Sequence, residues 1–218
     1  MKLTPYILAC LLATTMMTGL QAQAAPDYKT VSPASSVEAK SAPNFPVTNL
    51  YQALNTIQQP KSGSFTQRIA ILSTALEQSY DFPTILQKTV GYRFNGFSEQ
   101  QKSELLKAFK NYTVARYLSS FGANDDNIFK ILPKNKPSTV GKGMIVSTVI
   151  VSDGDSTPID YLVHQTDEGW KIVDVLLNGH ISQVAIQHGD FNSTLVKGGS
   201  QALIDMLNQK TKSFSIEK

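Results

Sequence analysis

Three apolar, β-branched segments follow one another closely in the second half of the chain, and their spacing is the feature that most restricts its fold. They cover residues 144–151, 159–164 and 170–177. The pair Asp153-Gly154 lies between the first two and is typical of a tight hairpin turn, and residues 166–169 provide the second turn. Because parallel strands need a crossover of a dozen or more residues, connections this short predict an antiparallel sheet.

Helical periodicity precedes this sheet. Apolar residues recur at three- and four-residue spacing over residues 47–57 and again over residues 66–79, which predicts two amphipathic helices. Asp81 is a suitable N-cap for a third, short helix, and Gly91 is a typical residue to end it.

The longest predicted helix begins at a capping box. Ser98 is followed three residues later by Gln101, whose side chain can reach back to the Ser98 amide, and Gly122 provides a stop. After the strands, helical spacing returns over residues 182–188, 190–197 and 200–212. An order of helices, strands and helices predicts an α+β architecture.

The N-terminus has the three-part layout of a secretory signal peptide. Lys2 is followed by an uncharged, largely apolar stretch, and Ala22-Gln23-Ala24 resembles a cleavage site. We expect residues 1–24 to be removed on export. The alternative is a retained membrane anchor, but Thr, Gly and Gln interrupt the distal end of the apolar run. Cys10 lies inside this segment, so the exported chain would contain no cysteine and no disulfide.

The remaining sequence divides into a leader and one domain. Residues 25–45 are rich in Ala, Ser and Pro and are expected to form a flexible leader. Residues 46–218 are long enough for a single domain with its own core. The net charge of the whole chain is +3, too small for the concentrated basic surface that nucleic-acid binding requires.

No recognisable metal, cofactor or catalytic motif is present in the sequence. The three histidines, His164, His180 and His188, have no cysteine or paired carboxylate beside them at ligand spacing, and surface or capping roles are expected for them. We place His180 and His188 near the two ends of one short helix. Glycine-rich phosphate-binding motifs are also missing from the sequence. We therefore predict no catalytic residue, no metal site and no cofactor.

Asp174 stands out as an acid inside an apolar run. It has two interpretations: a general base with a raised pKa, or a carboxylate that accepts hydrogen bonds and fixes a neighbouring loop or helix end. We favour the second. A Ser-His-Asp arrangement meets only in space, so a small-molecule enzyme on a cone-shaped α+β scaffold is the alternative function. A ligand-free adaptor with a filled interior is a third.

Aromatic residues are dense between Tyr80 and Phe121. For any one of them, a place in the core is the better interpretation. Helices that precede a twisted sheet can nevertheless leave a wedge-shaped space above it, and that space becomes an apolar pocket where side chains do not fill it. Composition alone does not decide between core and pocket.

Several short motifs follow one another in a specific order. They are Tyr80-Asp81-Phe82, Gly91-Tyr92, the helix start at residues 97–101, Asp153-Gly154, residues 169–175 and Gly179-His180-Ile181-Ser182. In order and spacing, this set resembles the MlaC family over roughly residues 50–210. Residues 181–185 look most like the hopanoid-associated HpnM branch of that family. Arg93-Phe94 stands where the family often has a Trp, which affects the expected ligand preference more than the fold.

The resemblance implies both a function and its partners. Members of the family are periplasmic phospholipid-binding proteins that shuttle lipid between the two membranes and maintain the lipid asymmetry of the outer membrane. The implied partners are an inner-membrane ABC transporter with an MCE-domain protein and an outer-membrane lipoprotein complex. The HpnM branch implies a hopanoid as cargo. The implied fold is a strongly twisted antiparallel sheet wrapped by helices, with the acyl chains inserted between them.

Lipid-binding residues are therefore expected among apolar side chains on the helices and on one sheet face. The predicted set is Tyr80, Phe82, Leu86, Val90, Phe109, Tyr112, Val146, Tyr161, Val163, Trp170, Ile172, Val175, Ile181 and Val184. Arg93, Arg116 and Lys171 are candidates for attracting an anionic headgroup, with ordinary surface solvation as the alternative.

Overall fold

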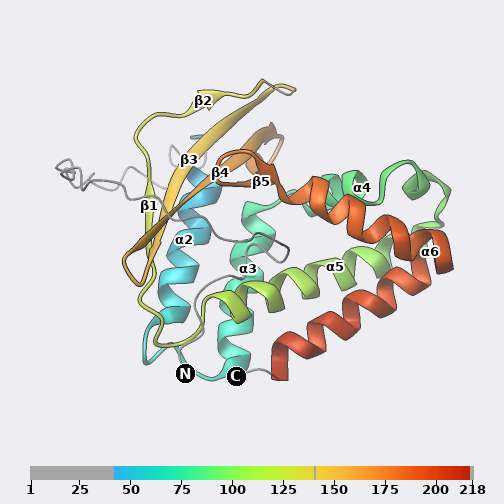
Figure 1. Cartoon of the computed structure of the whole chain (residues 1–218), viewed down its shortest axis with the longest axis horizontal. Helices are drawn as coiled ribbons and strands as arrows, with labels where there is room; N and C mark the ends of the chain where they lie inside the picture. The colour runs from blue at the N-terminus through green and yellow to red at the C-terminus, as the bar shows by residue number, and fades with distance from the viewer. Residues whose placement is uncertain (1–41, 140, 217–218) are drawn as a thin grey trace, which may run out of the picture.

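An antiparallel sheet forms one side of the molecule, and long helices pack beside it (Figure 1). The structure, a computed structural model, describes residues 42–139 and 141–216. The predicted signal peptide, residues 1–24, lies outside the described residues, and so do residues 25–41 of the predicted leader.

Within the described residues the sheet has six strands, all paired antiparallel. They are β1 (Ile128–Ile131), β2 (Lys136–Pro137), β3 (Gly143–Ser152), β4 (Asp155–Thr166), β5 (Gly169–Leu177) and β6 (Ile181–Ser182). The order is β1-β3-β4-β5-β6, and β2 also pairs with β3. Asp153 (φ 51°) and Gly154 (φ 87°) form the predicted turn, with the positive φ angles of a primed hairpin. The antiparallel sheet and the α+β class are confirmed.

The helices lie on one side of the sheet (Figure 1). They are α2 (Phe45–Gln58), α3 (Phe65–Ser79), α4 (Phe82–Val90), the 3₁₀ helix η2 (Gly91–Gly96), α5 (Glu99–Ser120) and α6 (Gln183–Ile216). α2 packs on α3, and α5 packs along α6 across the lower part of Figure 1. In the described ranges, no helix combines the length and the apolar character that a membrane crossing requires.

The predicted helix caps are present. Ser98 Oγ accepts from the Gln101 amide at 3.2 Å, and Gln101 Oε1 accepts from the Ser98 amide at 2.9 Å. Asp81 Oδ1 accepts from the Thr84 amide at 3.0 Å and caps α4. Gly91 ends α4 at φ 72°. These local signals were predicted correctly because each depends on residues only a few positions apart.

The C-terminal helices differ from the prediction. A helix boundary at Gly189 is wrong, because α6 continues through it and breaks only at Gly198 and Gly199. A lone glycine inside a helix costs about 1 kcal/mol, and burial of Phe191 and Leu195 offsets that cost. Gly199 has φ 65° and ψ −155°, a conformation that only glycine adopts readily.

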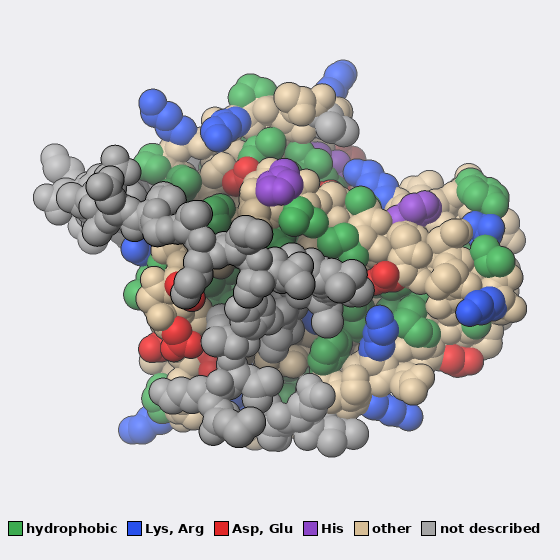
Figure 2. Space-filling model, viewed as in Figure 1, with side chains coloured by type: hydrophobic (Ala, Val, Ile, Leu, Met, Phe, Trp, Pro, Cys, Tyr) green, Lys and Arg blue, Asp and Glu red, His purple; other side chains and the backbone are tan. Residues whose placement is uncertain are grey.

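The core lies between the sheet and the helices. Its most deeply buried large side chains include Leu72 and Leu76 of α3, Phe109 of α5, Tyr161 of β4 and Phe191 of α6. On the part of the face in Figure 2 that grey atoms leave visible, Lys and Arg side chains are spread out and do not gather into one patch.

Candidate functional site

A cleft, called the slot below, lies between β5 and the helices α4, α5 and α6. Its empty volume is about 620 Å³, which includes space open to solvent, and the part that admits a water-sized sphere is about 60 Å³. Its apolar lining consists of Tyr80, Phe82, Ile85, Phe109, Tyr117, Phe121, Val175 and Val184. Its polar lining consists of Thr113, Arg116, Ser120, Asp174, Gln183 and Gln187.

One face of α5 supplies a long wall of the slot. Phe109, Thr113, Arg116, Tyr117 and Ser120 all line it, and spacings of three and four residues place them on the same side of a helix. The hydroxyls of Thr113 and Ser120 donate to the carbonyl oxygens of Phe109 and Arg116 within the helix. Arg116 and Tyr117 are the residues of this wall whose side chains hydrogen-bond outside the helix, to Gln183 and Tyr80 respectively.

The junction between α3 and α4 supplies a second, aromatic wall. Tyr80 forms a bridge to Ile172 of β5, and the Asp81 amide donates to the Ile172 carbonyl at 2.9 Å. The rings of Tyr80 and Phe82 stack with centroids 5.6 Å apart, and Phe82 meets Phe109 edge to face at 6.0 Å. Backbone pairing to the sheet therefore positions this wall.

Tyr80 and Tyr117 share a hydroxyl–hydroxyl hydrogen bond at the slot wall. Burial raises the pKa of both phenols, and the nearby charge of Arg116 only partly opposes that rise. Both hydroxyls are therefore neutral at physiological pH, and this part of the wall carries no charge.

Asp174 ties the start of α6 to β5. Its Oδ2 accepts from the Ser182 hydroxyl at 2.6 Å, while its Oδ1 accepts from the amides of Val175 at 2.8 Å and Val184 at 3.1 Å. The interpretation of Asp174 as a carboxylate that fixes a helix end is confirmed.

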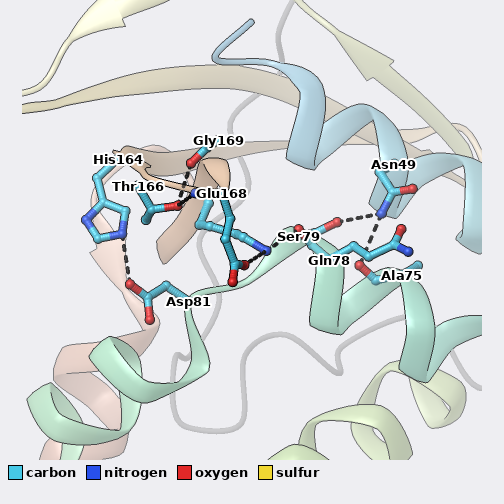
Figure 3. A network of polar contacts seen from close by, with 10 residues as sticks. Asn49, Ala75, Gln78, Ser79, Asp81, His164, Thr166, Glu168 and Gly169 are labelled. Carbon is cyan, nitrogen blue, oxygen red and sulfur yellow. Dashed lines mark hydrogen bonds and ion pairs between the residues drawn. The ribbon is translucent and has the colours of Figure 1, made fainter. Parts of the chain in front are cut away.

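A second polar network braces the slot from outside (Figure 3). The ring of His164 and the carboxylate of Asp81 point toward one another, with Nε2 and Oδ2 2.9 Å apart. Lys171 Nζ donates to the Gln78 carbonyl at 3.0 Å and lies 3.3 Å from Glu168 Oε2. These contacts hold the β4–β5 hairpin against the end of α3, beside the aromatic wall.

The other two histidines bind backbone carbonyls. His180 Nδ1 donates to the Asn178 carbonyl at 2.7 Å, and His188 Nδ1 donates to the Thr89 carbonyl at 3.0 Å. The expected position of the pair is wrong, because His180 lies in the turn before β6 and His188 lies inside α6. Across residues 42–139 and 141–216, no three His, Cys, Asp or Glu side chains gather as a metal site would require.

The predicted lipid-binding residues are distributed between the slot and the core. Five line the slot: Tyr80, Phe82, Phe109, Val175 and Val184. Seven are buried in the core away from it: Leu86, Val90, Tyr112, Val146, Tyr161, Val163 and Ile172. Trp170 is half-buried against the core, and Ile181 is exposed at 37%. Which of them contact a lipid stays a prediction.

The three cationic candidates also separate. Arg116 lines the slot. Arg93 donates to Asn192 Oδ1 at 2.7 Å and lies over the exposed Tyr92 ring. Lys171 donates to the Gln78 carbonyl in the polar network outside the slot. Gln183 and Gln187 of α6 line the slot without belonging to any sequence motif; only the spacing of four residues from one to the other hints at a shared face.

Comparisons with known proteins agree with this fold. A family model described as MlaC protein matches residues 47–209. Among solved structures, the chain is similar to a phospholipid-binding protein from Ralstonia solanacearum in complex with a phospholipid. The TM-score is 0.66 at 18% sequence identity, and the match covers 79% of this chain and 98% of that chain. At this identity the similarity establishes a shared fold. No curated protein matches the sequence.

Proposed function

This chain belongs to the MlaC family, and on that premise we propose that it is a periplasmic carrier that holds a phospholipid in the slot. The observation that carries the proposal is the composition of the slot: aromatic and aliphatic walls, with a single arginine among its lining residues. A lipid has the same division into apolar tails and a charged head. The solved structure with the shared fold contains a phospholipid.

The energetics of tail burial favour a carrier that depends on partners. Burying one methylene gains ~0.8 kcal/mol, so about thirty of them gain a gross ~24 kcal/mol. Net affinities do not exceed roughly 18 to 21 kcal/mol because ordering costs oppose binding. Release into water would therefore be slow, and a surface that opens the slot is needed. We propose an inner-membrane ABC transporter with an MCE-domain protein and an outer-membrane lipoprotein complex as those surfaces.

The enzyme alternative receives no support from Asp174. A general base needs an oxygen free to take a proton from its substrate. Asp174 instead accepts three hydrogen bonds, and two of them, from Ser182 and Val184, hold the start of α6. A carrier should return its lipid chemically unchanged after incubation, which chromatography of the extracted lipid can check.

Native mass spectrometry tests the proposal directly. Protein purified from a Gram-negative host should carry extra mass that organic extraction removes, and lipidomics of the extract should find phospholipid; hopanoid is the second cargo to be sought. The polypeptide itself should begin at Ala25 if residues 1–24 are cleaved on export. A uniformly unliganded protein that gains no mass from phospholipid or hopanoid vesicles would refute the proposal.

A matched pair of variants locates the lipid. Val184→Trp places a bulky ring in the slot and should reduce the lipid-bound fraction. Val196→Trp lies on the same helix at a position that is 64% exposed, and it should leave the bound fraction unchanged. Equal loss of lipid from both variants would contradict a site in the slot.

A further inference from the structure

Arg116 forms no ion pair with any described residue and lies beside the apolar walls of the slot. Among the described residues it is the only Lys or Arg that lines the slot. Its Nη2 donates to Gln183 Oε1 at 3.1 Å, and none of the ion pairs within the described part of the chain includes it. Asp174, the one carboxylate among the described residues that line the slot, already accepts hydrogen bonds from Ser182, Val175 and Val184.

Gln183 places a second hydrogen-bond donor at the same position. Gln183 is only 9% exposed, and it lines the slot as the first residue of α6. Its Oε1 accepts from Arg116, whereas its Nε2 is buried with no hydrogen-bond partner in residues 42–139 and 141–216. Buried donors are almost always satisfied, so an orphaned amide requires an explanation.

We propose that Arg116 and Gln183 bind the phosphate group of a phospholipid at the polar end of the slot. A phosphate offers several acceptor oxygens and a negative charge, which match the donors of a guanidinium and the free N–H bonds of the amide. The apolar walls lower the local dielectric and strengthen such bonds. This assignment rests on the proposed function, because it presumes that the tails occupy the slot.

The contact between the two side chains also prepares the site. Because Gln183 Oε1 accepts from Arg116, the guanidinium is held at the slot and the amide is turned so that Nε2 is the atom left over. Asp174 fixes the backbone at the start of α6, where Gln183 begins the helix. Donors that are oriented in advance lose less conformational freedom when the ligand binds.

The test compares two lipids that differ only in the head. Isothermal titration calorimetry would measure the Kd of dioctanoyl phosphatidylglycerol and of dioctanoylglycerol, which has the same chains and no phosphate. Loss of a charge-assisted hydrogen bond in Arg116→Gln should weaken phosphatidylglycerol binding roughly 10- to 100-fold and change dioctanoylglycerol binding less than about twofold. Gln183→Leu should act in the same direction.

Arg93→Gln is the matched control. It also removes an arginine that donates to a side-chain amide oxygen, that of Asn192, but at an exposed site outside the slot. It should leave both Kd values unchanged. Circular dichroism and thermal melting would verify that each variant folds. If Arg116→Gln does not fold, Gln183→Leu still tests the phosphate site.

The outcomes separate the two proposals. If the wild type binds neither lipid, the carrier function itself fails, and the phosphate site fails with it. The wild type could instead bind both lipids while Arg116→Gln or Gln183→Leu weakens the binding of both lipids equally, or of neither lipid. In that case the carrier function stands and only the phosphate site is overturned.

Discussion

Two aspartates show how single residues position the slot. Asp81 caps α4 through the Thr84 amide, and Asp174 accepts from the Val184 amide in the first turn of α6. A carboxylate is favourable at a helix N-terminus because it meets unpaired amides and the positive end of the helix dipole. Both helices contribute walls to the slot. The same chemistry therefore places two of the elements that form it.

Asp81→Asn should reduce stability in a pH-dependent way. Burial alone would raise the pKa of Asp81, but hydrogen bonds from Thr84 and the nearby His164 hold it below its ordinary value. A carboxyl with a lowered pKa contributes stability above its unfolded pKa of about 3.9, and that contribution is lost as the pH falls through the folded value. We expect Asp81→Asn to lower the free energy of unfolding at pH 7 by about 1 kcal/mol.

Urea denaturation at pH 7 and at pH 3 checks this expectation. The difference between Asp81→Asn and the wild type should shrink at pH 3, because the wild-type carboxyl is then losing its charge. Asp126→Asn, at an exposed acid, serves as the control and should match the wild type at both pH values. A difference of the same size at pH 7 and pH 3 would show that the charge of Asp81 is not involved.

At the scale of the elements, a β-bulge interrupts the alternation of side chains between the two sheet faces along β5. Tyr161 pairs with Val175, but Val163 pairs with Ile172, so the register of β4 and β5 shifts and Val173 is the extra residue. Ile172 and Val175 consequently share one sheet face although they are three positions apart. The alternation rule cannot locate such a shift from the sequence, whereas it predicts correctly that Tyr161 and Val163 share a face.

Gly91 joins α4 to η2 under two constraints. Its φ of 72° and ψ of −150° are accessible mainly to glycine. A Cβ there would lie 2.9 Å from His188 Cε1, and the His188 ring is held by the Thr89 carbonyl. Gly91→Ala should therefore destabilise the protein by both backbone strain and loss of that hydrogen bond.

Gly199 provides the comparison that separates backbone strain from the loss of the His188 hydrogen bond. It has nearly the same angles, φ 65° and ψ −155°, and open space where a Cβ would lie. We expect Gly91→Ala to lower the free energy of unfolding by about 1 kcal/mol more than Gly199→Ala. The excess, measured by urea denaturation, should disappear when His188 is Ala in both proteins. If the excess destabilisation persists without His188, its cause is the backbone at Gly91 and not the His188 contact.

At the scale of the whole molecule, the architecture was more predictable than the site. Short connections between β3, β4 and β5 permit only antiparallel neighbours, and helix caps are encoded locally. The slot depends on how α4, α5 and α6 cross β5, which no local pattern contains. For that reason Val175 and Val163, alike in type and in predicted role, lie in different places: Val175 lines the slot and Val163 is fully buried in the core.

These two valines allow core and slot to be distinguished by experiment, since they lie on neighbouring strands and share a face. Val163→Ala should lower the free energy of unfolding by about 2 kcal/mol, because it removes buried methyl groups and leaves a cavity, while lipid affinity stays near the wild-type value. Val175→Ala should cost less stability and weaken lipid binding by up to roughly tenfold. Urea denaturation and calorimetry with the same phospholipid measure both quantities. If Val163→Ala weakened binding as much as Val175→Ala, the lipid would extend past the slot into what is now the packed core.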